Sequence, residues 1–115
     1  MKISEVAMHL GAEILTPDTD CEREVYTACG SDMMSDVLAY VKDQALLLTG
    51  LNNPQVIRTA DMMDMTCVVF VRGKRPEQPM LDMATERGIS VLATEKTMFH
   101  ACGVLYAAGL REYKG

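Results

Sequence analysis

From Cys29 onward, one pattern repeats along the chain: a strand ends, a glycine or a polar residue follows, and an amphipathic helix begins. Four such units occupy residues 28–42, 45–64, 66–88 and 89–109. Three of the strand segments, ALLLT, CVVFV and SVLA, are continuous apolar runs rather than alternating ones, as strands buried on both faces require. Successive strand–helix units of this length connect as right-handed crossovers into a parallel sheet. The pattern therefore predicts an α/β fold, a three-layer sandwich with a mainly parallel central sheet flanked by helices.

Capping residues indicate where the helices of these units begin and end. The predicted N-caps are Ser31, Asn52 or Asn53, and Thr94. The predicted first helical residues are Pro54 and Pro79, and the predicted stops are Gly88 and Gly109. Apolar residues at helical spacing form the buried stripes. They are Met34, Val37, Leu38 and Val41 in the first helix, and Val56, Ile57, Ala60 and Met63 in the second.

The N-terminal region differs from these units. Ser4 is a candidate N-cap, Ile3 and Met8 occupy the positions of a hydrophobic staple around it, and Gly11 is the expected stop. Residues 12–16 and 22–30 are rich in β-branched and aromatic residues and are separated by the polar turn PDTDCE, so two strands are predicted. These strands could pair in either orientation and add an antiparallel edge to the sheet.

Composition limits the classes of function. At 115 residues the chain has room for one core, so a single domain over 1–115 is expected. A net charge of -5 disfavours binding to nucleic acid, whose phosphates attract basic proteins. No apolar run approaches the roughly 20 residues that span a bilayer, and the N-terminus lacks an apolar signal core. We expect a cytoplasmic protein without nucleic-acid or membrane partners.

No metal or cofactor site is predicted. Cys21, Cys29, Cys67 and Cys102 lack CxxC spacing, so reduced thiols are expected. His100 and Cys102 lie two residues apart on a predicted helix and would point to different faces. Asp61 and Asp64 are three residues apart and could share a helix face, but solvated carboxylates at an exposed helix end explain them better.

Four segments together carry a family resemblance: GSDMMSDVLAY, LLLTGLNNPQVIRTADMMDM, VVFVRGKRP and TMFHACGVLYAAGL. In this order they closely resemble the DRTGG domain family, although the string Asp-Arg-Thr-Gly-Gly does not occur in the chain. The resemblance implies an α/β domain similar to the N-terminal domain of HPr kinase/phosphorylase. Such domains occur alone, beside CBS domains in regulated pyrophosphatases, or before phosphotransacetylase, and they look regulatory or dimer-forming.

The motifs of a phosphate-transferring enzyme are missing. A P-loop needs G-x-x-x-x-G-K-[ST], whereas the segment from Gly50 to Pro54 has one glycine and no lysine, and Lys74 has no upstream glycine at the required spacing. No nucleophile elbow accompanies His9 or His100. We therefore expect a non-enzymatic regulatory or interaction module that dimerises and senses a small anionic ligand such as a nucleotide. The alternative is an enzyme, or a kinase-associated protein, that acts on phosphorylated substrates.

The candidate ligand site lies where strands end. Ligands of open parallel sheets bind in the crevice beyond the carboxyl ends of the strands, where loops and helix N-termini converge. The residues expected there are Thr49, Gly50, Asn52, Asn53, Arg72, Gly73, Lys74 and Thr94. Helix N-termini and the two basic side chains would attract an anion. Asn, Pro and Gly at such turns also serve capping and tight turning, so scaffold chemistry alone is the competing interpretation.

The last predicted helix is apolar almost all round, with small residues that would allow close approach of a partner. It is the candidate interface of a homodimer, or of a complex with a partner protein. The interface residues expected are Met98, Phe99, Ala101, Cys102 and Leu105. A core helix enclosed within the monomer explains the same pattern and remains the alternative.

Overall fold

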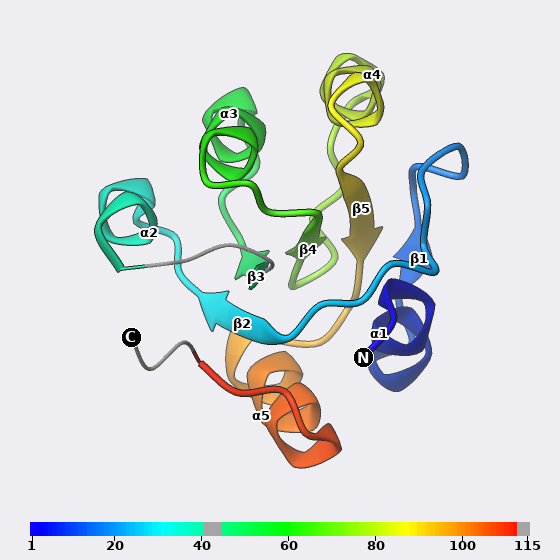
Figure 1. Ribbon diagram of the computed structural model, residues 1–115, viewed down its shortest axis with the longest axis vertical. Helices are drawn as coiled ribbons and strands as arrows, with labels where there is room; N and C mark the ends of the chain where they lie inside the picture. The colour runs from blue at the N-terminus through cyan, green and yellow to red at the C-terminus, as the bar shows by residue number, and fades with distance from the viewer. Residues whose placement is uncertain (41–44, 113–115) are drawn as a thin grey trace.

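The computed structural model describes residues 1–40 and 45–112, which form a five-stranded sheet with helices on both faces (Figure 1). The elements in chain order are α1 (Ile3–Leu10), β1 (Glu13–Ile14), β2 (Thr27–Gly30), α2 (Met34–Tyr40), β3 (Ala45–Thr49), α3 (Pro54–Met62), β4 (Cys67–Phe70), α4 (Gln78–Glu86), β5 (Ser90–Ala93) and α5 (Met98–Ala108). The predicted three-layer sandwich is confirmed.

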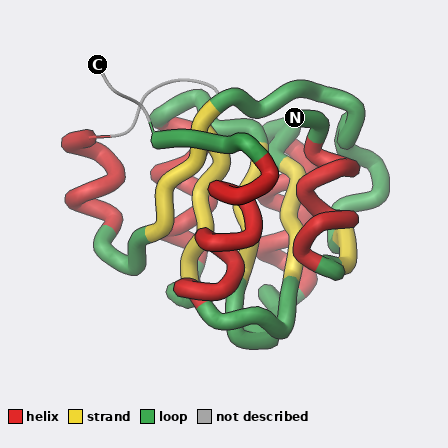
Figure 2. The backbone as a smooth tube through the Cα atoms, turned by 90° about the horizontal axis from the view of Figure 1, so that it is seen from below, coloured by secondary structure: helices red, strands yellow, loops and turns green. Residues whose placement is uncertain are grey.

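The strand order across the sheet is β1-β5-β4-β3-β2. Strands β2 to β5 are mutually parallel, and the short β1 pairs antiparallel with β5 through Glu13 opposite Ala93. The loops that follow the four parallel strands therefore meet at one edge of the sheet, and the N-terminus and the end of α5 lie toward the opposite edge (Figure 2). This arrangement brings the predicted ligand-site loops together.

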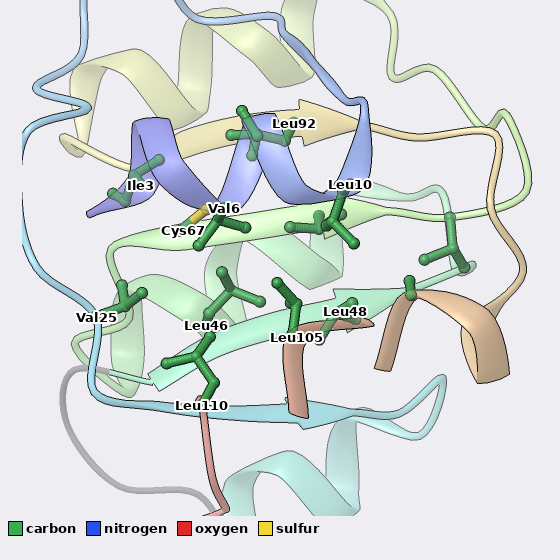
Figure 3. Packing of buried hydrophobic residues seen from close by; sticks show 14 residues of the cluster. Ile3, Val6, Leu10, Val25, Leu46, Leu48, Cys67, Leu92, Leu105 and Leu110 are labelled. Atoms are coloured by element: carbon green, nitrogen blue, oxygen red, sulfur yellow. The ribbon is translucent and has the colours of Figure 1, made fainter. Parts of the chain in front are cut away.

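Each face of the sheet packs against its own layer of helices. Leu47, Val68 and Phe70 point to the side of α2, α3 and α4, whereas Leu46, Leu48 and Val69 point to the side of α1 and α5. Figure 3 shows this second core, in which Leu10 of α1 and Leu105 of α5 come from opposite ends of the chain. Strands covered on both faces explain the continuous apolar runs of the sequence.

The N-terminal predictions need three corrections. Helix α1 begins at Ile3, so Lys2 is the N-cap instead of Ser4, and its backbone N–H donates to the Glu5 carboxylate at 2.8 Å. Met8 is 70% exposed and forms no staple with Ile3. The two early strands do not pair with each other, because β1 and β2 lie at opposite edges of the sheet, although β1 does supply the predicted antiparallel edge. The stop at Gly11 is confirmed, since its φ of 58° is left-handed.

Among the caps of the repeated units, Asn53 and Pro54 are placed as predicted: the Asn53 side chain accepts from the N–H of Gln55 at 2.9 Å. Ser31 lies three residues before α2, and its hydroxyl oxygen accepts from the Met33 N–H instead of capping the helix. The N-cap of α5 is Thr97 rather than Thr94.

Smaller differences concern helix ends and stripes. Helix α4 begins one residue before Pro79, and Gly88 follows its C-cap with a φ of 70°, close to the predicted stop. The glycine stop at Gly109 is confirmed. Leu38 is 41% exposed rather than buried, and Val41 lies outside the described residues. Val56, Ile57 and Ala60 are buried, and Met63 is half-buried against the same core.

The four cysteines are free thiols. Burial raises the pKa of Cys29 to about 11, with a smaller contribution from nearby Cys102. Burial likewise raises the pKa of Cys67 and of Cys102. The thiols of Cys29, Cys67 and Cys102 therefore stay protonated at neutral pH, as packing groups do. Among the described residues, no helix has the length and apolar character needed to cross a membrane.

Candidate functional site

The loops after β3 and β4 meet at the carboxyl edge of the sheet. A Cβ built on Gly50 would lie 2.6 Å from a guanidinium nitrogen of Arg72, so the arginine side chain rests directly on the glycine. Nearby, the Asn52 side-chain amide donates to the Arg75 carbonyl at 3.4 Å. The structure thus brings Gly50, Asn52 and Arg72 together, as expected from the order of the strands.

The loop after β4 also joins the end of β5. The Gly73 N–H donates to the Thr94 carbonyl at 2.9 Å, and the Arg72 N–H donates to the Lys96 carbonyl at 2.8 Å. These bonds hold residues 72–74 beside residues 94–96. We call the region formed by residues 49–52, 72–75 and 94–96, together with Asp32, the strand-end crevice.

Asp32 was not among the predicted site residues, yet its carboxylate binds the end of β3. One carboxylate oxygen accepts from the Gly50 N–H at 2.7 Å and from the Thr49 hydroxyl at 3.0 Å. The end of β3 therefore already binds an anionic group, supplied by the chain itself. The sequence signal was available, because Asp32 is the second residue after the neighbouring strand β2 and must lie at the same edge.

Arg72 has an unusual backbone. Its φ of 58° is left-handed, and with Gly73 at 70° it forms the centre of a tight turn closed by the Lys74 N–H donating to the Val71 carbonyl at 3.2 Å. Non-glycine residues with positive φ are uncommon, and Gly, Asn and Asp dominate such turns. Within residues 1–40 and 45–112, the Arg72 side chain makes neither an ion pair nor a hydrogen bond. The exposed Arg72 guanidinium thus lies over Gly50, although the left-handed backbone of Arg72 is unfavourable in free energy.

The neighbouring part of the crevice is acidic. A Cβ on Gly73 would lie 2.7 Å from a Glu95 carboxylate oxygen. Glu13 of β1 forms a two-pronged ion pair with Arg75, at 3.0 and 3.1 Å, and this hydrogen-bonded partner and its charge lower the pKa of Glu13. A small cavity of about 190 Å³ lies among these groups. Arg75 is therefore already paired with a carboxylate, whereas Arg72 has no such partner among the described residues.

Several predicted site residues serve the fold. Thr94 is buried, and its hydroxyl donates to the Leu10 carbonyl at 2.9 Å, tying β5 to the end of α1. Thr49 is buried and bonded to Asp32, and the Asn53 side chain caps α3. Asn52 and Lys74 are exposed at the crevice. The groups open to a ligand are thus Arg72, Lys74 and Asn52.

The predicted interface residues on α5 divide in two. Ala101 and Leu105 are fully buried against the sheet, so the interface assignment of these two is corrected to core. Met98 and Cys102 are half-buried beside Gly30 of β2, where a Cβ would come within 2.9 Å of both sulfur atoms. Phe99 is 90% exposed. The outward face of α5 carries Phe99, His100, Gly103, Tyr106 and Ala107 and has no acidic or strongly basic residue.

A solved structure shares this fold. It holds the CBS and DRTGG domains of the regulatory region of Clostridium perfringens pyrophosphatase, complexed with the activator diadenosine tetraphosphate. The similarity has a TM-score of 0.76 at 15% sequence identity and covers 90% of this chain but 45% of that chain. The protein described here therefore corresponds to less than half of its structural neighbour.

Comparison with curated proteins gives no match. Comparison with protein-family models gives one that spans nearly the whole chain, residues 5–108, and is described as the DRTGG domain. The match includes every strand and helix of the sheet and its two layers, apart from the first residues of α1. The chain belongs to the DRTGG domain family.

Proposed function

We propose that this protein is a non-enzymatic regulatory module that binds a small phosphorylated ligand in the strand-end crevice and dimerises through the outward face of α5. The main observation in support of a ligand concerns Arg72. Its exposed guanidinium lies over Gly50, its backbone is left-handed, and its side chain has no partner among the described residues. Strained, sparsely populated backbone conformations concentrate at ligand clamps and switch regions.

Charge supports an anion as the ligand. The chain carries a net charge of -5, so a cation that is not needed for a salt bridge stands out against its surroundings. Arg75 pairs with Glu13, whereas Arg72 and Lys74 have no carboxylate within 4 Å among the residues that the structure describes. A guanidinium presents several donors in a fixed plane that matches phosphate oxygens.

Asp32 gives the crevice a competing anion. Its carboxylate binds the Gly50 N–H and the Thr49 hydroxyl, the two donors that a phosphate at the end of β3 would use. An incoming phosphate would bind Arg72 and Lys74 and exchange with Asp32 at the strand end. Such an exchange would release the loop between β2 and α2, which gives ligand binding a structural consequence.

The structural neighbour supports the class of ligand. It is a regulatory region that contains a DRTGG domain and was solved with a polyphosphate dinucleotide activator. A ligand of the same chemistry, two or more linked phosphates with a net negative charge, fits the basic part of the crevice.

The test is calorimetric titration with inorganic pyrophosphate, ATP and diadenosine tetraphosphate. At least one should bind, and Arg72→Ala should weaken its affinity about tenfold, as expected for loss of a charge-assisted hydrogen bond. Arg58→Ala removes the same charge from the exposed surface of α3 and should leave the affinity unchanged. Failure of all three anions to bind, or equal losses in both variants, would contradict the proposal.

The dimer proposal depends on two features of α5. Phe99 is 90% exposed, an unusual position for a large aromatic side chain. Gly103 lies in the middle of the helix, where glycine costs about 1 kcal/mol relative to alanine. A Cβ at Gly103 would meet no atom within 4 Å, so nothing in the described monomer requires glycine there. Close approach of a second α5 would require it.

Light scattering tests the dimer. The wild-type protein should have twice the monomer mass at micromolar concentration, and Phe99→Asp should reduce it to that of the monomer. Met62→Asp places the same charge on another exposed apolar residue, on α3, and should leave the dimer intact. A monomeric wild type would refute dimerisation, and a dimeric Phe99→Asp would exclude this face.

A further inference from the structure

A second pocket, of about 390 Å³, lies between β2 and α5. Its walls are the edge strand at Ala28 and Gly30, the α5 residues Cys102 and Tyr106, and the segment after α5 at Arg111. Leu48, Leu105 and Leu110 form its apolar floor, and Figure 3 shows them gathered between α5 and the sheet. None of the crevice residues lines this pocket.

The edge strand directs polar backbone groups toward the pocket side. The Ser31 N–H donates inward to the Leu48 carbonyl, whereas the Ala28 N–H donates outward to the Arg111 carbonyl at 3.0 Å. Because alternate residues of a strand bond to opposite sides, Ala28 and Gly30 are the outward-facing residues of β2. Within residues 1–40 and 45–112, nothing bonds to the Ala28 carbonyl or the Gly30 N–H.

This pair of groups defines a recognition edge. A carbonyl at one residue and an N–H two residues later lie on the same side of a strand and present an acceptor and a donor side by side. A ligand that bonds to both the Ala28 carbonyl and the Gly30 N–H needs a donor and an acceptor next to each other, as on the edge of a rigid ring. The 6-amino group and N1 of adenine have that arrangement, and a planar ring suits an apolar slot between a strand and a helix.

The side chains around the pocket fit an aromatic ligand. Tyr106 is 60% exposed, and the Arg111 guanidinium covers its ring at 4.0 Å from the centroid. Arg111 is held in place because it donates to the Tyr106 and Leu110 carbonyls at 2.6 and 2.8 Å. The Cys102 and Met98 sulfur atoms lie where a Gly30 Cβ would be, so α5 packs directly on the end of β2. The volume is at the low end of the range for small-molecule pockets, which suits a nucleobase or nucleoside.

A peptide that adds as a further strand is less well matched. Strand addition needs several consecutive open positions along an edge. Here the bridge between Arg111 and Thr27 closes one end, and the strand ends at Gly30 at the other. We propose that this pocket binds an adenine-type base through the Ala28 carbonyl and the Gly30 N–H, independently of the strand-end crevice.

Adenosine is the probe, because it lacks phosphate and so does not test the anion site. In a ¹H–¹⁵N NMR titration it should shift the Gly30 amide resonance in a saturable way. N6,N6-dimethyladenosine keeps the ring but has no donor for Ala28, and it should bind at least tenfold more weakly. Tyr106→Ala should weaken adenosine binding about fivefold or more through loss of aromatic contact, whereas Tyr106→Phe should retain it within about twofold.

Three outcomes would overturn the proposal. They are the absence of a saturable Gly30 shift at millimolar adenosine, equal binding of the dimethylated analogue, and equal affinities of the two Tyr106 variants. Because Tyr106 is exposed, both variants should fold, and their amide spectra check this. A short peptide that shifts Gly30 while adenosine does not would assign the edge to strand addition instead.

Discussion

Replacing Arg72 by glycine should make the protein more stable, although it removes a whole side chain. The left-handed conformation costs a non-glycine residue about 1–2 kcal/mol, which glycine does not incur. The greater freedom of glycine in the unfolded chain offsets about 0.4–1 kcal/mol of this gain. The net expectation for Arg72→Gly is about 0.5–1 kcal/mol of added stability, a rise in Tm of roughly 2–6 °C for a chain of this size.

Urea unfolding followed by circular dichroism measures this difference, with Lys74→Gly as the matched control. Lys74 belongs to the same turn but has an ordinary negative φ, so glycine there should cost about 0.4–1 kcal/mol. If Arg72→Gly is less stable than the wild type by a similar amount, the guanidinium over Gly50 supports the fold. Arg72 would then serve stability, and its left-handed conformation would need no ligand to explain it.

Three further predictions concern the helix, the thiols and catalysis. Gly103→Ala should raise the unfolding free energy of the monomer by about 1 kcal/mol, since the added methyl meets open space. The same methyl should weaken the dimer in sedimentation experiments, and a dimer of unchanged affinity would exclude close contact between the two helices. Folding raises the pKa of Cys29 to about 11 from an ordinary 9.0, and it also raises the pKa of Cys67. The unfolded chain therefore loses these protons first, so stability should fall as the pH rises above 9, and it should fall less in Cys29→Ala. An equal fall in the variant would show that other groups cause the alkaline loss of stability. The purified protein should neither hydrolyse ATP nor phosphorylate HPr, and turnover that is lost on mutating a residue of this chain would refute this.

The parallel sheet could be predicted because its sequence signals are local and repeated. Continuous apolar runs such as Cys67–Phe70, each followed by a turn and a helical stripe, leave few other folds open. The caps at Asn53 and Gly109 follow directly from residue chemistry. The early strands were harder, since β1 has only two residues and its partner β5 is about 80 positions away in the chain. No local pattern specifies such a pairing.

The meeting of the loops after the parallel strands at one edge could be predicted, whereas the bonds that their side chains make could not. Strand order places Gly50 and Arg72 at one edge, and the structure brings them into contact. Thr94 fitted the same rule, but its hydroxyl bonds to Leu10, which depends on how α1 packs and is not visible in sequence. The left-handed φ of Arg72 was equally hidden, because arginine is not a residue that marks such turns.

The most direct test of the central claim is a ¹H–¹⁵N NMR titration with inorganic pyrophosphate at constant ionic strength. The strand-end crevice predicts saturable shifts of the Gly50, Arg72 and Gly73 amides, accompanied by a shift at Asp32 as its carboxylate leaves the end of β3. The Gly109 amide, after α5 and toward the opposite edge of the sheet, should stay unchanged. Shifts that grow linearly without saturation, or that spread evenly over the surface, would show that the crevice is scaffold alone.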